Sequence, residues 1–596
     1  MNNTVQFKSC AVNASAGFGK TENLAVRFIG MLLAADNPET SLSTIVAMTF
    51  TRAAAMEIYE RVVLILCGAL KNGMDGLNRK LQSSGVTATR EQTERLLKLL
   101  ILYKNRLNIS TIDSFMLNIA SAFPFELGFP GAPEIISGFD SERISIIMIG
   151  RLLGEAAGDE AEELREACRE ALVESAAGKQ LFTVAEELLL QAKTYYAWRN
   201  QPECWERFAD IRLDKRTAAA DFSIWESYRN SDAFAKDRAK PRGMELHNLM
   251  EKCRDINEYT GFSSAELASL REIFKSWEDF DCGELKPDGF AFMNKFPAEC
   301  RMAVKRLLKL AADLLILRSG RRTAAIRKLL ADYSDSYRRE VLARGMAGFS
   351  DLPLILCDHS NEWVYDIHFR LNSRLRHWLI DEFQDTGMEQ LEVFNSIIDE
   401  LPEDEARSLY IVGDVKQAIY GWRSGDYRLM AAEKKRFCLQ DETLPHSYRY
   451  GLDICHGLNT IFAPEALAHA AIPELTAKDW NAAWTRHTPG RDVDGCMEIL
   501  QLQPESTMEF AELINTRLEE LKWQERAMQC AILVRDNKEG MELKEALINL
   551  NPALQDKLTW EGEESIASDY FIAALLELMV FLQHPGDTLS LFAAEM

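Results

Sequence analysis

The chain has 596 residues, a formal net charge of −23, 47% hydrophobic residues and 27% charged residues. This length exceeds what one hydrophobic core supports, so three or four domains are predicted. The acidic balance excludes a protein coated in positive charge, but it allows a local groove that binds nucleic acid.

The cysteines and the chain start bear on location. The twelve cysteines are scattered, with no C-x-x-C pair, which predicts free thiols in a reducing compartment and no zinc or iron–sulfur site. The first residues, MNNTVQFKSCAVNASAG, lack the basic and apolar regions of a signal peptide. The sequence contains no stretch of about twenty apolar residues, so it predicts no membrane helix. We therefore expect a cytoplasmic protein.

Residues 1–130 alternate short apolar runs with helical periodicity. VQFKSCAVNA reads as a strand, ASAGFGKT as a loop and ENLAVRFIGMLLAA as a helix; STIVAMTF is the next strand, before the helix RAAAMEIYERVVLIL. This order is typical of a parallel sheet with helices on both faces, which is an α/β fold.

The remaining residues predict an insertion and a second sheet. Residues 131–345 have an almost wholly helical pattern and no convincing buried strand. RLRHWLIDEF and SLYIVGDV then resume the first domain over 346–440. MEILQLQ and CAILVRD predict a second α/β sheet within 441–563, and a helix, DYFIAALLELMVFLQ, lies in the final segment, 564–596.

The loop ASAGFGKT has the strand–loop–helix setting of a phosphate-binding loop. Its two glycines, Gly17 and Gly19, allow backbone N–H groups to surround a phosphate. Lys20 would bridge the β- and γ-phosphates, and the Thr21 hydroxyl would ligate magnesium. A chance GKT in a loop is the alternative, since alanine replaces the first glycine of the general pattern. The predicted ATP contacts in this loop are Ala14, Ser15, Ala16, Gly17, Phe18, Gly19, Lys20 and Thr21.

The segment LIDEFQDT places two adjacent carboxylates at a strand end. Asp381 would hold magnesium, and Glu382 would accept a proton from the attacking water. Adjacent side chains at a strand end point to different sides, which suits these separate roles. A surface Asp-Glu cap is the alternative, but the apolar WLI that precedes the pair disfavours it.

Two further residues are candidate sensors of the γ-phosphate. Gln417 in GDVKQAIY offers a neutral amide that can contact both the γ-phosphate and the water. Arg449 in LPHSYRY is a cation that could act as an arginine finger. A lone arginine is more often a surface residue, so this prediction depends on the other motifs.

Aromatic and small polar residues near these motifs predict a surface for DNA. Tyr420 and Trp422 closely follow Gln417, and base stacking on such rings contributes about 1–3 kcal/mol per base. Hydroxyls in ISTIDSF could bond phosphates. Core packing is the alternative for any single aromatic residue. The predicted DNA contacts are Phe50, Thr51, Thr111, Ser114, Tyr420, Trp422 and Arg423.

These motifs in this order resemble the UvrD/Rep group of superfamily 1 helicases, above all the AddA and RecB types of recombination helicase–nucleases. The resemblance implies a P-loop NTPase with two RecA-like domains that clamp ATP and Mg²⁺, and an α-helical insertion in the first. It also implies 3′–5′ translocation on single-stranded DNA. Tyr448 would stack on adenine. The catalytic residues would be Lys20, Asp381, Glu382, Gln417 and Arg449.

The chain departs from the family pattern at several positions, none of which removes an essential charge. Glu22 stands where several relatives have arginine, Val415 replaces a proline, Asp113 a histidine and Ser447 an asparagine. Residues 564–596 resemble the start of an insertion in the second domain, and the last helicase motifs and a nuclease domain are not found within the 596 residues. The resemblance therefore predicts the N-terminal portion of an ATP-dependent 3′–5′ DNA helicase of double-strand-break repair and recombination. Its expected partners are duplex or single-stranded DNA and a second protein of the AddB/RecC type.

Two other function classes remain open. A non-catalytic or assembly protein that binds ATP and DNA without unwinding would be expected to have a damaged phosphate loop or acidic pair, and both are intact here. A phosphate-loop kinase or GTPase would lack the aromatic turn after Gln417, and stimulation of ATP hydrolysis by single-stranded DNA separates that class from a helicase.

Overall fold

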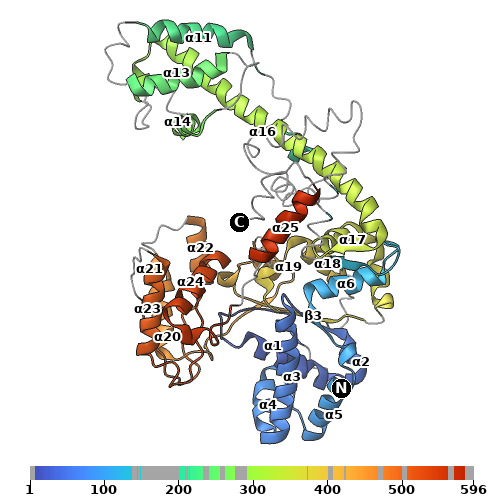
Figure 1. Ribbon diagram of the computed structural model, residues 1–596. Helices are drawn as coiled ribbons and strands as arrows, with labels where there is room; N and C mark the ends of the chain where they lie inside the picture. The colour runs from blue at the N-terminus through green and yellow to red at the C-terminus, as the bar shows by residue number, and fades with distance from the viewer. Residues whose placement is uncertain are drawn as a thin grey trace. The chain divides into compact units, whose positions relative to one another are not determined.

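The structure is a computed structural model, and it forms two units, Met1–Gly495 and Cys496–Met596, each described by itself (Figure 1). The residues that it describes are 7–136, 144, 148, 201–208, 213, 215–231, 240–254, 262–275, 291–371, 374–399, 407–421, 425–467, 474–499, 506–560 and 570–583.

The first unit contains a six-stranded parallel sheet in the order β3-β2-β6-β7-β1-β8. Apolar side chains on its two faces form separate cores. One core packs under α1, α3 and α5, and the other packs under α6, α17 and α18. The prediction of an α/β fold is thus confirmed. The bounds are β1 Cys10–Asn13, β2 Ile45–Thr49, β3 Asn108–Thr111, β6 His377–Ile380, β7 Ser408–Gly413, β8 Gln440–Thr443, α1 Lys20–Ala34, α3 Arg52–Asn72, α5 Arg90–Leu102, α6 Ile112–Ala122, α17 Asp351–Arg370 and α18 Met388–Asp399.

The strand order determines which residues gather at the ligand-binding edge of the sheet. In a parallel sheet the carboxyl ends of the strands meet at one edge, which is where open α/β sheets bind ligands. The neighbours β2, β6, β7 and β1 therefore bring together the residues that follow them, namely Phe50, Asp381, Asp414 and Ala14.

The sheet extends beyond the boundary predicted at residue 440. The strand β8 pairs in parallel with β1, from Cys10–Gln440 to Asn13–Thr443, so the first sheet includes residues assigned to a second domain by the sequence. All four β8 residues are exposed. Their polar QDET sequence gave no strand signal, and such polar residues are characteristic of an edge strand.

Helices occupy most of the described residues between positions 201 and 340. The 43-residue helix α16, Ala298–Glu340, carries α11, α13 and α14 near one end (Figure 1). Apolar side chains such as Trp225, Leu249 and Leu307 form their common core. Two short strands, β4 Glu134–Ile136 and β5 Met346–Gly348, pair in parallel at the base of this helical segment. The bounds of the shorter helices are α10 Pro202–Glu206, α11 Lys215–Arg229, α13 Lys240–Arg254 and α14 Ser264–Lys275.

The first unit ends in a helical segment after β8. It comprises α20 Leu452–Phe462, α21 Pro464–Leu467 and α22 Glu474–Ala483, followed by an extended chain through residue 495. The shorter helix α19, Leu429–Arg436, precedes β8, and α4, Asp75–Leu81, lies between α3 and α5.

The predicted second sheet is not formed in the described residues after 443. The second unit contains α23 Thr507–Glu520, α24 Asn537–Leu550 and α25 Tyr570–Gln583. In CAILVRD, Ile532 and Val534 pack on the α23–α24 core while Leu533 is 94% exposed. This is the alternation of a strand, but a strand also needs a neighbour for its backbone hydrogen bonds, and the described residues supply none. MEILQLQ lies partly outside the described residues.

Two further observations concern the described part of the chain. No described helix has both the length and the apolar character needed to cross a membrane. The cysteines described are free thiols.

The start of β6 gives a prediction for acid stability. Burial, and then the charges of Arg27 and Arg376, lower the pKa of His377 to about 4, while its Nδ1 lies 3.0 Å from Ser408 Oγ. The imidazole is therefore protonated near pH 6.5 in the unfolded chain but stays neutral in the folded chain. Folding stability consequently falls as pH drops from 6.5 towards 4. Between pH 6.5 and 4 we expect the free energy of unfolding of His377→Gln to fall by up to about 3 kcal/mol less than that of the wild type.

Chemical denaturation at a series of pH values measures this difference. The matched control is His456→Gln on the exposed side of α20, which should retain the wild-type pH dependence. Equal pH dependence of His377→Gln and the wild type would contradict the prediction.

Candidate nucleotide-binding site

The phosphate loop connects β1 to α1 with two glycines in the left-handed region. Gly17 has φ 80° and Gly19 has φ 82°, a conformation that glycine adopts without a Cβ penalty. Ala14 has no such conformation. It lies 2% exposed in the core beneath the loop, and its N–H donates to the Gly413 carbonyl at 3.1 Å. This position therefore does not require the glycine of the general pattern.

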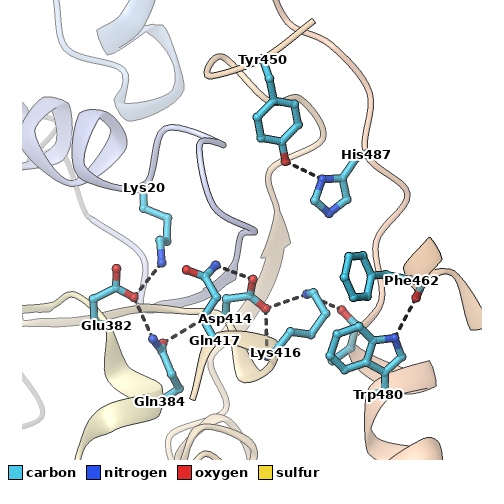
Figure 2. Close-up of polar contacts among 11 residues, drawn as sticks. Lys20, Glu382, Gln384, Asp414, Lys416, Gln417, Tyr450, Phe462, Trp480 and His487 are labelled. Atoms are coloured by element: carbon cyan, nitrogen blue, oxygen red, sulfur yellow. Dashed lines mark hydrogen bonds and ion pairs between the residues drawn. The ribbon is translucent and has the colours of Figure 1, made fainter. Parts of the chain in front are cut away.

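Lys20 and Glu382 form an ion pair across the site. The Lys20 Nζ lies 2.7 Å from Glu382 Oε2, and the Lys20 side chain is only 9% exposed. Gln384 Nε2 donates to the same carboxylate at 2.8 Å (Figure 2). Glu382 itself has φ 50°, a strained value for a residue with a Cβ that costs on the order of 1–3 kcal/mol. A strained residue held by two partners is typical of a functional site.

Asp381 is almost completely buried beside this pair, and its Oδ1 accepts the N–H of Glu382 at 3.0 Å. Burial, and then the neighbouring charge of Glu382, raise the pKa of Asp381 to about 6. A divalent cation would favour the charged carboxylate and reverse this effect.

Three buried polar atoms at the same edge lack a hydrogen-bond partner among the described residues. They are Asn13 Oδ1, Ser15 Oγ and Thr49 Oγ1. Buried polar groups are nearly always bonded, so an unpaired set of this kind indicates a missing water, ion or ligand. With Lys20, Thr21 and Asp381, these atoms fit a magnesium–triphosphate group.

The turn that carries Tyr448 and Arg449 packs directly on the phosphate loop. The Tyr448 N–H donates to the Gly17 carbonyl at 2.8 Å. A Cβ added to Gly17 would lie 2.5 Å from the Arg449 Cβ, so no other residue fits there. Within the described part of the chain, the exposed Arg449 guanidinium forms no ion pair. The structure thus brings this predicted cation to the predicted phosphate site.

The loop after β7 that carries Gln417, residues 414–417, is called the sensor loop, and hydrogen bonds connect its own side chains. Gln417 Nε2 donates to Asp414 Oδ2, and Lys416 Nζ donates to Asp414 Oδ1, both at 2.6 Å. Gln384 connects this loop to the acidic pair, because its Oε1 accepts the Asp414 N–H at 2.9 Å while its amide bonds Glu382. The sequence interpretation missed Gln384 and Lys416, although both lie inside the quoted motifs.

Comparison with protein families identifies the group to which the chain belongs. The model of the UvrD/REP helicase N-terminal domain matches residues 2–438. The chain belongs to the UvrD/REP helicase family.

Several curated proteins are similar to this family member, and each is named as one of the subunits of an ATP-dependent helicase/nuclease. The protein of Oceanobacillus iheyensis is 24% identical over 76% of this chain and 38% of its own length. That of Geobacillus thermodenitrificans is 22% identical over 98% of the chain and 50% of its own length. That of Carboxydothermus hydrogenoformans is 26% identical over 69% and 34%. The chain thus spans half or less of the length of these relatives.

The structure describes part of the aromatic surface that the sequence predicts for DNA. The rings of Phe50 and Tyr420 are in contact, with centroids 4.4 Å apart. Trp422 and Arg423 lie outside the described residues. The structure therefore brings together two of the predicted DNA-binding aromatics from opposite ends of the first sheet domain's sequence.

The predicted hydroxyl contacts with DNA serve as helix caps in this structure. Thr51 Oγ1 accepts the Ala54 N–H at 3.1 Å, and Thr111 Oγ1 accepts the Ser114 N–H at 3.1 Å. Thr111 Oγ1 also lies 2.7 Å from Ser114 Oγ. Their roles toward DNA stay predictions.

Glu22, one of the predicted departures from the family pattern, faces two cations of neighbouring helices. Lys80 bonds its carboxylate, and Arg61 lies 3.6 Å away. The loop therefore gains no unpaired negative charge from this departure.

Proposed function

We propose that this chain is the ATP-hydrolysing part of a 3′–5′ DNA helicase or translocase of double-strand-break repair and recombination. The observation that carries the proposal is the Lys20–Glu382 pair, with Arg449 on a turn packed against the same phosphate loop. A cation for phosphate, a base for water and a second cation then surround one site.

The residues divide the reaction among themselves. The loop N–H groups and Lys20 hold the phosphates, which replace Glu382 as the partner of the Lys20 ammonium. The released Glu382 carboxylate accepts a proton from the attacking water. Thr21 and Asp381 would hold Mg²⁺, which neutralises charge on the phosphates when bound. Gln417 and Arg449 contact the γ-phosphate, and the Tyr448 ring lies against adenine.

DNA binding is proposed at the Phe50–Tyr420 ring pair. The rings touch at 4.4 Å, which leaves no room for a base between them. A base therefore stacks on the outer face of the pair, or the rings separate to admit it. Tyr420 follows Gln417 closely, so either event can be transmitted to the ATP site. Trp422 and Arg423 extend this surface in the proposal.

The partner and the compartment are proposed from the relatives and the composition. The similar proteins are named as helicase/nuclease subunits, so we propose that this chain acts with a second protein of the AddB/RecC type. We propose the cytoplasm as its compartment, where ATP, DNA and a reducing environment for its thiols are present.

ATP hydrolysis measured with and without single-stranded DNA tests the proposed function. We expect hydrolysis to rise with DNA, and unwinding to be supported by a duplex with a 3′ tail but not by one with a 5′ tail. ATP binding without DNA-stimulated hydrolysis would instead favour the non-catalytic assembly protein. Hydrolysis that is indifferent to DNA would favour an unrelated phosphate-loop enzyme.

Removing the Phe50 ring is expected to weaken binding of a single-stranded oligonucleotide about tenfold, because one stacked base contributes about 1–3 kcal/mol. Fluorescence anisotropy of a labelled oligonucleotide measures the change in Phe50→Ala. The control is Phe369→Ala on α17, whose side chain is 85% exposed and should be dispensable. Unchanged affinity in Phe50→Ala would exclude the ring pair from the DNA path.

A further inference from the structure

The loop that follows α22 lies against three segments of the nucleotide site. We call this loop, together with Ala483 at the end of α22, the bracket (residues 483–490). Its main chain fixes the turn that carries Tyr448 and Arg449: the Ser447 N–H donates to the Thr488 carbonyl at 2.8 Å, and the Gly490 N–H donates to the Ser447 carbonyl at 2.7 Å. Ser447 is completely buried between them.

The Tyr448 ring rests on the bracket at Gly490. A Cβ at position 490 would lie 2.8 Å from the ring atom Cε1, so the ring fits only against glycine. The Tyr448 residue is 48% exposed and lies beside Gly19 of the phosphate loop. The bracket therefore limits how the ring lies beside the loop.

His487 joins the bracket to the phosphate loop. Its ring meets the buried Phe18 ring edge to face, with centroids 5.1 Å apart. The Tyr450 hydroxyl lies within hydrogen-bond distance of His487 Nδ1, at 2.7 Å (Figure 2). Asn459 bonds both the N–H and the carbonyl of His487, at 2.9 and 2.8 Å. Burial, and then the charge of Lys416, lower the pKa of His487, which favours the neutral imidazole.

The bracket also contacts the sensor loop. Lys416 Nζ donates to the Ala483 carbonyl at 3.0 Å while it bonds Asp414, the acceptor of the Gln417 amide (Figure 2). One short segment is thus connected to the phosphate loop, the sensor loop and the Tyr448–Arg449 turn. A movement of any one of these three segments would change the contacts of the bracket with the other two.

We propose that the bracket is a positioning element of the ATP site, and that His487 is the positioning residue that ties the Tyr448 turn to Phe18 of the phosphate loop. The proposal rests on the proposed function, since it takes ATP as the ligand. It assigns roles to His487 and Gly490, which lie outside the motifs of the phosphate site. It also makes the bracket act on the base side of the nucleotide more than on the phosphates.

The test compares two ligands that share the phosphates and differ in the base. Binding of Mg-ATP and of Mg-tripolyphosphate to the full chain is measured by titration calorimetry, with thermal unfolding as the check on folding. We expect His487→Ala to lower the ratio of ATP affinity to tripolyphosphate affinity about tenfold, since one ring contact and one hydrogen bond are lost. Tyr450→Phe, which removes only the hydroxyl, should lower the ratio about threefold.

The control is His456→Ala, a histidine exposed on α20, which should leave the ratio unchanged. An unchanged ratio in folded His487→Ala overturns the proposal, including the case where both affinities fall equally. If His487→Ala does not fold, the ratio in Tyr450→Phe decides in the same way. A wild-type chain that binds neither ligand overturns the proposed function, and the bracket proposal with it.

Discussion

Replacing Glu382 by glutamine is expected to lower the ATP turnover number by at least about a hundredfold, because a neutral amide cannot accept a proton from the attacking water. ATP affinity should rise about two- to fivefold in the same variant. The structure explains this opposite effect: the Lys20 ammonium is paired with the Glu382 carboxylate at 2.7 Å, and in the variant the phosphates of ATP no longer compete with that charge.

Single-turnover hydrolysis and equilibrium ATP binding measure the two effects separately. The matched control is Glu389→Gln, in the first turn of α18 shortly after the same strand, and it should change neither quantity. A turnover number within about tenfold of the wild type would show that another group serves as the base.

Gly17→Ala is expected to weaken ATP binding about a hundredfold. Two costs add at this position. A residue with a Cβ is disfavoured at φ 80° by about 1–2 kcal/mol, and the new methyl would lie 2.5 Å from the Arg449 Cβ, a clash worth about 1–3 kcal/mol. The loop and the Tyr448–Arg449 turn must therefore separate, which removes both the cation and the ring from the site.

Gly76→Ala provides the control for this variant. Gly76 lies in α4 with nothing within 4 Å of an added Cβ, so alanine should stabilise the helix by about 0.5–1 kcal/mol and leave ATP affinity unchanged. Titration calorimetry measures the binding of both variants. Wild-type affinity in Gly17→Ala would show that contact between the turn and the loop is not needed to hold ATP.

The parts of the fold that the sequence predicted are those with a local signal. The buried strands Ile45–Thr49 and Ser408–Gly413 are continuous apolar runs, and the phosphate loop is identified by a few adjacent residues. The strand Gln440–Thr443 is polar and exposed, so only its pairing partner reveals it. CAILVRD shows the converse case, since its alternation is that of a strand but no neighbour within the described residues pairs with it.

The residues of the candidate site were likewise predictable where they belong to a local sequence motif. Lys20, Glu382 and Arg449 follow from motifs, and the structure places all three around one loop. The bracket could not be found in this way, because His487 reaches Phe18 and Gly490 supports Tyr448 only through the folding of distant segments. A histidine and a glycine in a loop carry no local pattern that indicates such contacts.

The strand order has a consequence for synthesis of the chain. Among the strands that the structure describes, Cys10–Asn13, which leads into the phosphate loop, has only β7 and β8 as neighbours, and these begin at Ser408 and Gln440. At ribosomal rates of about 5–20 residues per second, this apolar strand waits tens of seconds for its first partner. During that time β2 and β3 can already pair. The strand that leads into the future ATP site therefore stays without its sheet partners through most of the synthesis of the chain.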